Sequence, residues 1–343
     1  MQDLPVTSTP RRQFLTSLPR PRTDPAQPEE ERGYWIRVHR RAMACRFEVV
    51  LAAEDRVFVP AATRALDEID RLEDELSVFR ETSTISALNR SAAGRAVVVP
   101  RYLIDLLTNC QRLYRDTEGA FDVTTMPLSR CWGFLRRQGC VPDADAIAAA
   151  RALVGFDAVQ LGRDELSVRF GRRGVELNLG AIGKGYALDR AGSGLRASGV
   201  AHALLSGGGS SLLALGGRGQ GWRIDLVSPL VTDRAIAGVW LRNAALGTSG
   251  AGEQFVIADG HRYGHVIDPR TGWPADGVLS ASVVATDAAS ADALSTAFLI
   301  GGIDLASRYC AEHRDVLALI TPDDGSKRPI VIGSHRGARL VWQ

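Results

Sequence analysis

Hydrophobic and polar positions follow two different periods along this chain, which predicts both strands and helices. Residues 35–39 and 47–51 alternate with a period of two and are rich in branched side chains, as paired strands are. Over residues 61–76 apolar side chains recur every three or four positions opposite a charged face, which predicts an amphipathic surface helix. Further helices are expected over 102–114, 143–153, 184–198 and 289–299. The polar stretch 77–89 has neither period and is expected to be an ordered loop.

The second half of the chain contains short apolar runs separated by glycine-rich turns. These runs are expected to be strands at 168–170, 203–205, 222–227, 239–241, 255–258 and 281–285. They do not alternate strictly with helices, so the pattern favours an α+β fold of mixed and antiparallel sheets flanked by helices over a doubly wound parallel sheet. Residues 34–343 are expected to form one domain with a soft division into two lobes near residue 160. Residues 1–33 are Pro-rich and charged, which predicts a disordered tail.

Composition narrows the function classes. The 343 residues are 45% hydrophobic, enough for a substantial core. A formal net charge of +2 provides no overall field for nucleic acid or an anionic membrane, so we expect no nucleic acid partner. No window approaches the ~18 uncharged apolar residues of a membrane helix, so no transmembrane segment is expected. The five cysteines form no C-x-x-C pair, which indicates neither a disulfide framework nor a zinc site.

The N-terminus bears on localisation. The stretch Thr-Pro-Arg-Arg-Gln-Phe-Leu at residues 9–15 is similar to a twin-arginine export signal. A signal of this kind is followed by an apolar stretch of roughly seven to fifteen residues, and here a Pro-rich, charged stretch follows instead. We therefore expect a cytoplasmic protein, with export as the less favoured alternative.

Three motifs carry candidate chemistry. Asp292 and Thr296 are four residues apart, which places a carboxylate and a hydroxyl on one helix face. Mg²⁺ prefers such oxygen donors, but the alternative is a carboxylate that favours the helix dipole and a threonine that packs. Three glycines and Lys184 mark a helix entrance at 177–189, which indicates an anion site or simply tight packing.

The third motif, residues 263–274, sets His265 and Asp268 at the end of an apolar strand. His265 is of the type that accepts protons near neutral pH, and Asp268 alternatively forms an Asx turn. The aromatics after residues 119–128 are suited either to border a planar ring or to fill the core. Residues 247–250 offer hydroxyls or form an ordinary turn.

Taken in order, these segments resemble the ApbE family of FAD:protein FMN transferases from about residue 43 to residue 302. The matching segments are Met43-Ala-Cys, the stretch 76–89, Ala120-Phe-Asp122, the Gly-Lys-Gly helix entrance, Thr248-Ser-Gly250, His265-Val-Ile-Asp-Pro-Arg-Thr-Gly272, and Ala291-Asp292 with Thr296. The resemblance implies a T-fold-like, two-lobed architecture. It also implies an enzyme that binds FAD and Mg²⁺, cleaves the pyrophosphate, attaches FMN through its phosphate to a Thr or Ser of an acceptor protein, and releases AMP.

The resemblance also implies roles for single residues. The Mg²⁺ ligands would be Asp292, Ser295, Thr296 and the carbonyl of Ala181. FAD would be bound by Met43, Phe79, Ala120, Phe121, Asp122, Asn178, Lys184 and Ile267. His265 is the candidate that accepts the proton of the acceptor hydroxyl, and Asp268 is second.

Some positions depart from the family pattern. Phe79 replaces the usual Tyr, which keeps the ring and removes a hydroxyl hydrogen bond worth about 1 kcal/mol. Residues 207–211 replace an Asn-x-Gly-Gly-Asp turn and Asn178 replaces a frequent Asp. Two alternatives stay open: an FAD pyrophosphatase that transfers to water, and a non-catalytic flavin-binding protein.

Overall fold

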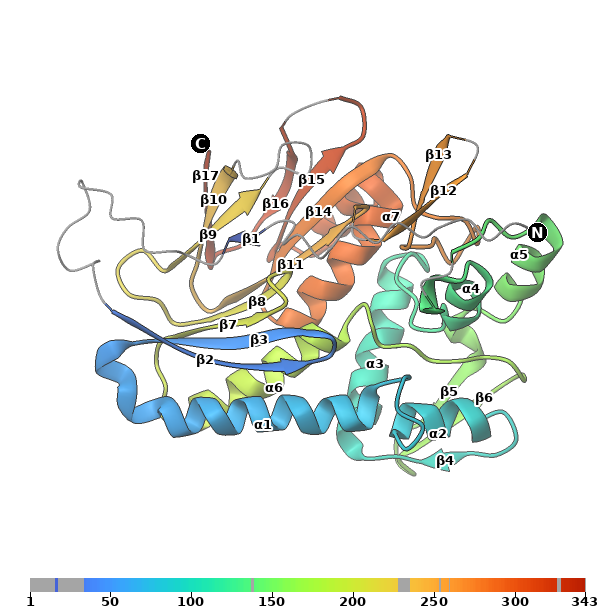
Figure 1. Cartoon of the computed structure of the whole chain (residues 1–343), viewed down its shortest axis with the longest axis horizontal. Helices are drawn as coiled ribbons and strands as arrows, with labels where there is room; N and C mark the ends of the chain where they lie inside the picture. Colours follow the sequence, from blue (N-terminus) through green and yellow to red (C-terminus); the bar gives the residue numbers. More distant parts are fainter. Residues whose placement is uncertain are drawn as a thin grey trace.

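The computed structural model describes residues 16–17, 34–136, 139–227, 235–252, 254–258, 260–325 and 328–342. Its centre is an eight-stranded sheet in which every described strand pair is antiparallel. In spatial order the strands are β16 (Ile330–Ser334), β15 (Val316–Pro322), β14 (Val278–Ala285), β11 (Ala244–Gly250), β8 (Ser211–Leu215), β7 (Ala203–Gly207), β3 (Cys45–Ala52) and β2 (Trp35–Ala42). Figure 1 shows this sheet running through the middle of the molecule.

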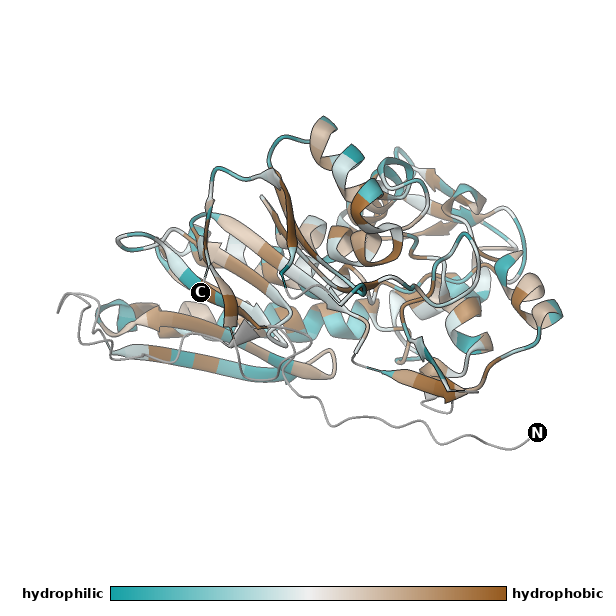
Figure 2. Cartoon of the chain, turned by 90° about the horizontal axis from the view of Figure 1, so that it is seen from above, coloured by the Kyte–Doolittle hydropathy of each residue, from teal (hydrophilic) through white to brown (hydrophobic). Residues whose placement is uncertain are grey.

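Each face of this sheet has its own cover. Three helices cover one face: α1 (Val59–Leu76), which follows the 3-10 turn Ala53–Phe58, α6 (Gly183–Ala197) and α7 (Ala288–Glu312). A four-stranded sheet covers the other face, in the order β1 (Thr16–Ser17), β9 (Trp222–Val227), β10 (Ala235–Leu241) and β17 (Ala338–Trp342). Figure 2 shows brown, hydrophobic bands on the strands of both sheets. Phe47 and Val49 of β3 pack toward the helices and Val50 toward the second sheet, as the period of two requires.

A third part, the helical lobe, comprises residues 84–170. It contains α2 (Thr84–Ser91), β4 (Val97–Val98), α3 (Arg101–Asp116), α4 (Met126–Cys131), the 3-10 turns Phe134–Arg136 and Phe156–Ala158, α5 (Ala144–Arg151), β5 (Val159–Gly162) and β6 (Ser167–Phe170). A separate hairpin of β12 (Phe255–Ala258) and β13 (His261–Gly264) extends beside this lobe (Figure 1).

These elements confirm the predicted α+β class and correct several local predictions. The expected loop 77–89 ends early because Ser83 caps α2, its hydroxyl accepting from the Ser86 N–H, so Asn89 is helical. The turn proposed at 247–250 is part of strand β11. The chain enters the helical lobe after α1 and leaves it before α6, and residue 160 lies in β5, which pairs with β6 inside that lobe. Of the predicted tail, only Thr16–Ser17 is among the described residues, where it pairs with β9.

Helix α7 is the one described helix that is long and apolar enough to cross a membrane. Of its apolar window, 67% is buried inside the molecule, so it packs as a core helix between the large sheet and the helical lobe. Its helical geometry breaks at Gly302 (φ 65°), close to the predicted end at residue 299.

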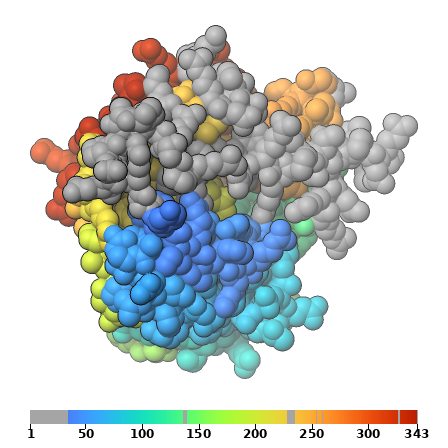
Figure 3. Space-filling model, turned by 60° about the vertical axis from the view of Figure 1, so that its left-hand side comes forward, coloured from blue at the N-terminus to red at the C-terminus, as the bar shows by residue number. Residues whose placement is uncertain are grey.

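The basic edge strand β2 is held by acidic partners. Arg40 donates to Asp67 and Asp70 of α1 at 2.5 and 2.6 Å, and Arg37 donates to Glu48 of β3 at 3.2 Å. Figure 3 shows the blue atoms of this strand and of α1 side by side on one face. Charged side chains of this kind also discourage pairing with another strand edge.

The turn between β2 and β3 provides a first prediction. Met43 (φ 48°) and Ala44 (φ 56°) both have positive φ, the signature of a two-residue type I′ hairpin turn that favours glycine. Ala44→Gly should raise the free energy of unfolding by roughly 0.5–1 kcal/mol, since glycine avoids the Cβ clash but adds entropy to the unfolded chain. Chemical denaturation measures the change. Ala42→Gly, in extended backbone, is the control and should destabilise. An Ala44→Gly protein that is less stable than the parent would contradict this interpretation of the turn.

Candidate active site

Three elements come into backbone contact where α7 begins. A Cβ added to Gly247 of β11 would lie 2.4 Å from the Ala291 carbonyl oxygen, and one added to Gly185 of α6 would lie 2.0 Å from that of Ala288. Glycine is therefore required at both positions, because any side chain would push the elements apart. Ser211 of β8 pairs with Gly247, so this close packing brings β8, α6 and α7 together around Asp292.

The Asp292 carboxylate lies at the centre of this junction. Asp292 is 5% exposed, and its two oxygens accept hydrogen bonds from the Ser211 hydroxyl at 2.6 Å and the Gly185 N–H at 2.7 Å. Burial raises its pKa above the ordinary value, and the nearby charge of Lys184 and the two hydrogen bonds oppose that shift. No basic side chain in the described part of the chain lies within ion-pair distance of it. It is thus a buried carboxylate without a formed salt bridge.

Hydroxyl groups gather one helical turn further along α7. The Ser249 hydroxyl of β11 lies 2.9 Å from that of Ser295 and 3.1 Å from that of Thr296. Ser295 and Thr296 also donate to the backbone carbonyl of Asp292, at 2.8 and 3.3 Å. Gly247 and Ser249 face the same side of β11 because side chains alternate along a strand, so the hydroxyl cluster continues the junction that holds Asp292.

Lys184 brings a positive charge to the same place. Its ammonium donates to the Ser210 hydroxyl at 2.6 Å, in the glycine-rich turn between β7 and β8. Only two of the 41 basic residues are lysine, Lys184 and Lys327. The chain thus uses a compact ammonium here and arginine almost everywhere else. Two of the N–H groups at the helix entrance are already bonded: that of Gly183 to the Leu179 carbonyl and that of Gly185 to the Asp292 carboxylate.

The turn that precedes α6 links it to the helical lobe. The Asn178 N–H donates to the Val123 carbonyl at 2.7 Å, and the Asn178 side chain accepts from the Gly180 N–H at 3.0 Å. Asn178 therefore holds the shape of the turn that contains Ala181, which is partly buried. These two residues lie next to the Lys184 helix entrance in the chain, but no contact of Ala181 with Asp292 is described.

Two other predicted residues lie in connections between elements. Met43 is at the tip of the β2–β3 hairpin, where Gly208 of the glycine-rich turn donates its N–H to the Arg46 carbonyl at 2.9 Å. Phe79 is in the loop after α1 and is 74% exposed. An aromatic ring this exposed is available for stacking.

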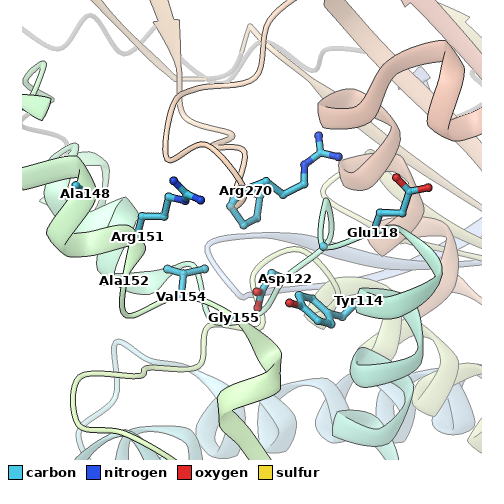
Figure 4. A pocket seen from close by; sticks show the side chains of 11 residues that line it. Tyr114, Glu118, Asp122, Ala148, Arg151, Ala152, Val154, Gly155 and Arg270 are labelled. Atoms are coloured by element: carbon cyan, nitrogen blue, oxygen red, sulfur yellow. The ribbon is translucent and has the colours of Figure 1, made fainter.

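A cavity of about 470 Å³ opens on the helical lobe. Asp122 is one of its lining residues, together with Tyr114, Glu118, Gly119, Ala148, Arg151, Ala152, Val154, Gly155, Pro269 and Arg270. Figure 4 shows that its walls come from α3, α5 and the 268–272 turn. Its volume is within the range of small-molecule sites. Ala120 and Phe121 are each 1% exposed and belong to the core, so a ligand here would meet their backbone rather than their side chains.

Asp122 itself is almost fully enclosed, at 6% exposed. Its Oδ1 accepts from the Thr124 N–H and hydroxyl, both at 2.7 Å, and the Thr124 hydroxyl accepts from the Gly155 N–H at 2.7 Å. Burial is the largest influence and raises the Asp122 pKa to about 6, against the hydrogen bonds, which lower it.

This pKa predicts a pH-dependent stability difference. Because Asp122 keeps its proton to a higher pH in the folded state than in the unfolded state, its contribution to the free energy of unfolding falls between about pH 4 and pH 6 and levels off above about pH 7. Asp122→Asn retains the Oδ1 acceptor and cannot ionise. The free energy of unfolding of the variant, relative to that of wild type, should therefore rise by up to roughly 3 kcal/mol from pH 4 to pH 8. Denaturation at each pH measures this difference. A difference that does not change with pH would contradict this.

His265 and Asp268 follow β13, and Asp268 directly precedes the cavity residues Pro269 and Arg270. His265 Nδ1 lies 3.2 Å from the Gln254 carbonyl oxygen, which can only accept, so Nδ1 carries the proton and Nε2 keeps its lone pair in the neutral ring. Asp268 accepts three hydrogen bonds from Arg270, at 2.9, 2.9 and 2.8 Å. It is thus an Asx-turn residue with an ion pair, whereas Ile267 is buried and pairs with Pro274.

The structure therefore brings Asp292, Ser295, Thr296 and Lys184 into one junction. It places Asp122 in the lining of the cavity with Pro269 and Arg270, and Ile267 in a buried apolar cluster, and it brings neither Met43 nor Phe79 into a described contact with the junction. Sequence reasoning missed Asp189, whose carboxylate bonds α7 from α6, and the cavity arginine Arg151. Neither had a local signal, because both depend on contacts with distant segments.

Comparisons with known proteins identify the family. The model of the ApbE family matches residues 43–320. The chain is 31% identical to an FAD:protein FMN transferase of Klebsiella pneumoniae over 81% of this chain and 86% of that protein. It is 34% identical to one of Treponema pallidum over 81% and 84%. The crystal structure of an ApbE protein from Thermotoga maritima superposes with a TM-score of 0.78 at 28% identity, covering 88% of this chain and 97% of that one. The chain belongs to the ApbE family.

Proposed function

We propose that this protein is an FAD:protein FMN transferase that acts with Mg²⁺. In this reaction the pyrophosphate bond of FAD breaks. FMN becomes linked through its phosphate to a Thr or Ser hydroxyl of an acceptor protein, and AMP is released. The observation that carries the proposal is the buried Asp292 carboxylate, flanked by hydroxyls and Lys184, in a chain whose relatives bear this name.

The residues at the junction fit a magnesium ion. Asp292 is a carboxylate buried without a salt bridge, and Ser295 and Thr296 add neutral oxygen donors beside it. No group of three or more His, Cys, Asp or Glu side chains in the described residues is arranged for a metal, so the set differs from a carboxylate cage and leaves positions for phosphate oxygens. Asp292, Ser295, Thr296 and the Ala181 carbonyl would hold the ion. When bound, Mg²⁺ offsets the charge that builds up on the phosphates.

Lys184 contributes to the same task. Its ammonium, held by Ser210, would supply a positive charge to the pyrophosphate at this junction. The remaining parts of FAD would extend toward the cavity around Asp122 and toward the exposed ring of Phe79. Met43, Asn178 and Ile267 line the space between these points in this proposal, and Ala120 and Phe121 contribute backbone.

His265 is the proposed proton acceptor. Its Nδ1–H donates to the Gln254 carbonyl, which orients the ring, and Nε2 is the nitrogen that would take the proton of the incoming hydroxyl. Asp268 is the weaker candidate because both of its oxygens already accept from Arg270. Its proposed role is to shape the turn beside the cavity.

The experiment is incubation with FAD, Mg²⁺ and a peptide or domain that bears a flavinylation-type Thr. The proposal predicts that the acceptor gains the mass of an FMN group in equal amount to the AMP released. FMN and AMP released without any gain in acceptor mass would identify an FAD pyrophosphatase. FAD bound without AMP release would identify a flavin-binding protein, and either result would overturn the proposal.

A further inference from the structure

The first turns of α6 and α7 are joined by two carboxylates that point in opposite directions. Asp189 of α6 accepts the Ala288 and Ala289 N–H groups of α7, at 2.8 and 2.9 Å. Asp292 of α7 accepts the Gly185 N–H of α6 at 2.7 Å. Each helix thus satisfies N–H groups in the first turn of the other, which its own backbone leaves unpaired.

These hydrogen bonds join α6 and α7 where the two helices are already in close backbone contact. Because Gly185 lies against the Ala288 carbonyl with no room for a Cβ, a small movement of α7 changes the position of Asp292 directly. Asp287 caps α7 within its own chain segment, accepting from the Ser290 N–H at 2.7 Å, so the helix itself does not depend on Asp189. Asp189 instead fixes the position of α7 relative to α6.

We propose that Asp189 is a positioning residue that sets the Asp292 carboxylate in place to hold the metal ion. The metal ion in this inference comes from the proposed function, whereas the contact between α6 and α7 does not depend on it. Asp189 is not itself a ligand in this proposal, because both of its oxygens are directed at backbone N–H groups of α7. Its effect passes through the first turn of α7 to Asp292, three residues after Ala289.

The variant that tests this is Asp189→Asn, which keeps the size of the side chain. Its amide group presents N–H toward one of the two α7 N–H groups, so one bond is lost and replaced by a repulsive contact. Asp287→Asn is the matched control, since asparagine is an equally good N-cap and the bonds between the helices remain. Thermal unfolding verifies that both variants are folded.

Two readouts are needed, and neither depends on turnover. The first is the affinity for Mn²⁺ in the presence of FAD, which is measured from the relaxation rate of water protons. Asp189→Asn should weaken Mn²⁺ binding by roughly 10- to 100-fold, whereas Asp287→Asn should leave it within about twofold. The second is hydrogen exchange of the Gly185 amide in ¹⁵N-glycine-labelled protein without metal. Asp189→Asn should speed that exchange at least about tenfold, because the bond to Asp292 opens.

The two readouts separate the two hypotheses. Gly185 exchange that is unchanged in Asp189→Asn overturns the positioning role, whatever the metal does. Wild-type protein that binds no Mn²⁺ contradicts the proposed function, and faster Gly185 exchange in the variant would then still support control of Asp292 by Asp189. Mn²⁺ binding that is equal in wild type and variant overturns the inference as it concerns the metal.

Discussion

Replacing Asp292 with asparagine should lower the rate of FMN transfer by about 10³-fold or more while the protein stays folded. The substitution keeps the size and one oxygen of the side chain, so bonds with Ser211 or Gly185 persist. It removes the negative charge that would bind Mg²⁺, and neutralisation of phosphate charge by a metal is worth several kcal/mol in the transition state. Each 1.36 kcal/mol corresponds to a factor of ten.

The measurement is the rate at which the acceptor gains FMN at saturating FAD, over a range of Mg²⁺ concentrations. Asp304→Asn is the matched control, because Asp304 lies on the same helix but is exposed. It should behave as wild type. An Asp292→Asn enzyme that keeps more than about a tenth of the wild-type rate at high Mg²⁺ would refute the metal-ligand role.

Lys184→Met should lower the transfer rate on the order of 10²-fold, and Lys184→Arg should not restore it. A unit charge a few ångströms from the developing phosphate charge is worth a few kcal/mol at the dielectric of a partly buried site. Methionine keeps the unbranched stem and loses that charge. Arginine keeps the charge but is a larger, planar group that does not match the ammonium bond to Ser210.

Transfer rates and FAD affinity, read from flavin fluorescence without Mg²⁺, measure this prediction. Arg190→Met, on the exposed side of the same helix, is the control and should leave both quantities unchanged. Lys184→Arg at the wild-type rate would show that any positive charge suffices and would contradict the specific role of the ammonium.

The sequence predicts a helix or strand where the burial of one face of that element produces a regular spacing of apolar residues. Helix α1 shows its period because one face is buried against the sheet, and β2 and β3 show theirs because successive side chains point to opposite faces. The sequence did not predict β11, since Gly247-Thr-Ser-Gly250 has the composition of a turn. It is a strand because it pairs with β8 and β14, and position 247 is glycine because α7 approaches too closely for a side chain.

The site residues that could be predicted are likewise those with a local spacing in the sequence. Asp292 and Thr296 were identified because residues four apart on a helix lie on one face, whereas their partners Ser211, Gly185 and Ser249 lie on other elements. Asp189 could not be predicted as their neighbour, because its bonds join residues about 100 positions apart in the chain. The raised pKa of Asp122 likewise depends on burial by segments that no local pattern identifies.

One measurement addresses the whole account: a crystal structure of the protein with FAD and Mn²⁺, with anomalous scattering recorded from the metal. The account predicts an anomalous peak within about 2.5 Å of an Asp292 carboxylate oxygen, with the FAD pyrophosphate between that peak and Lys184. A metal peak away from Asp292, or a pyrophosphate bound out of reach of both residues, would contradict it.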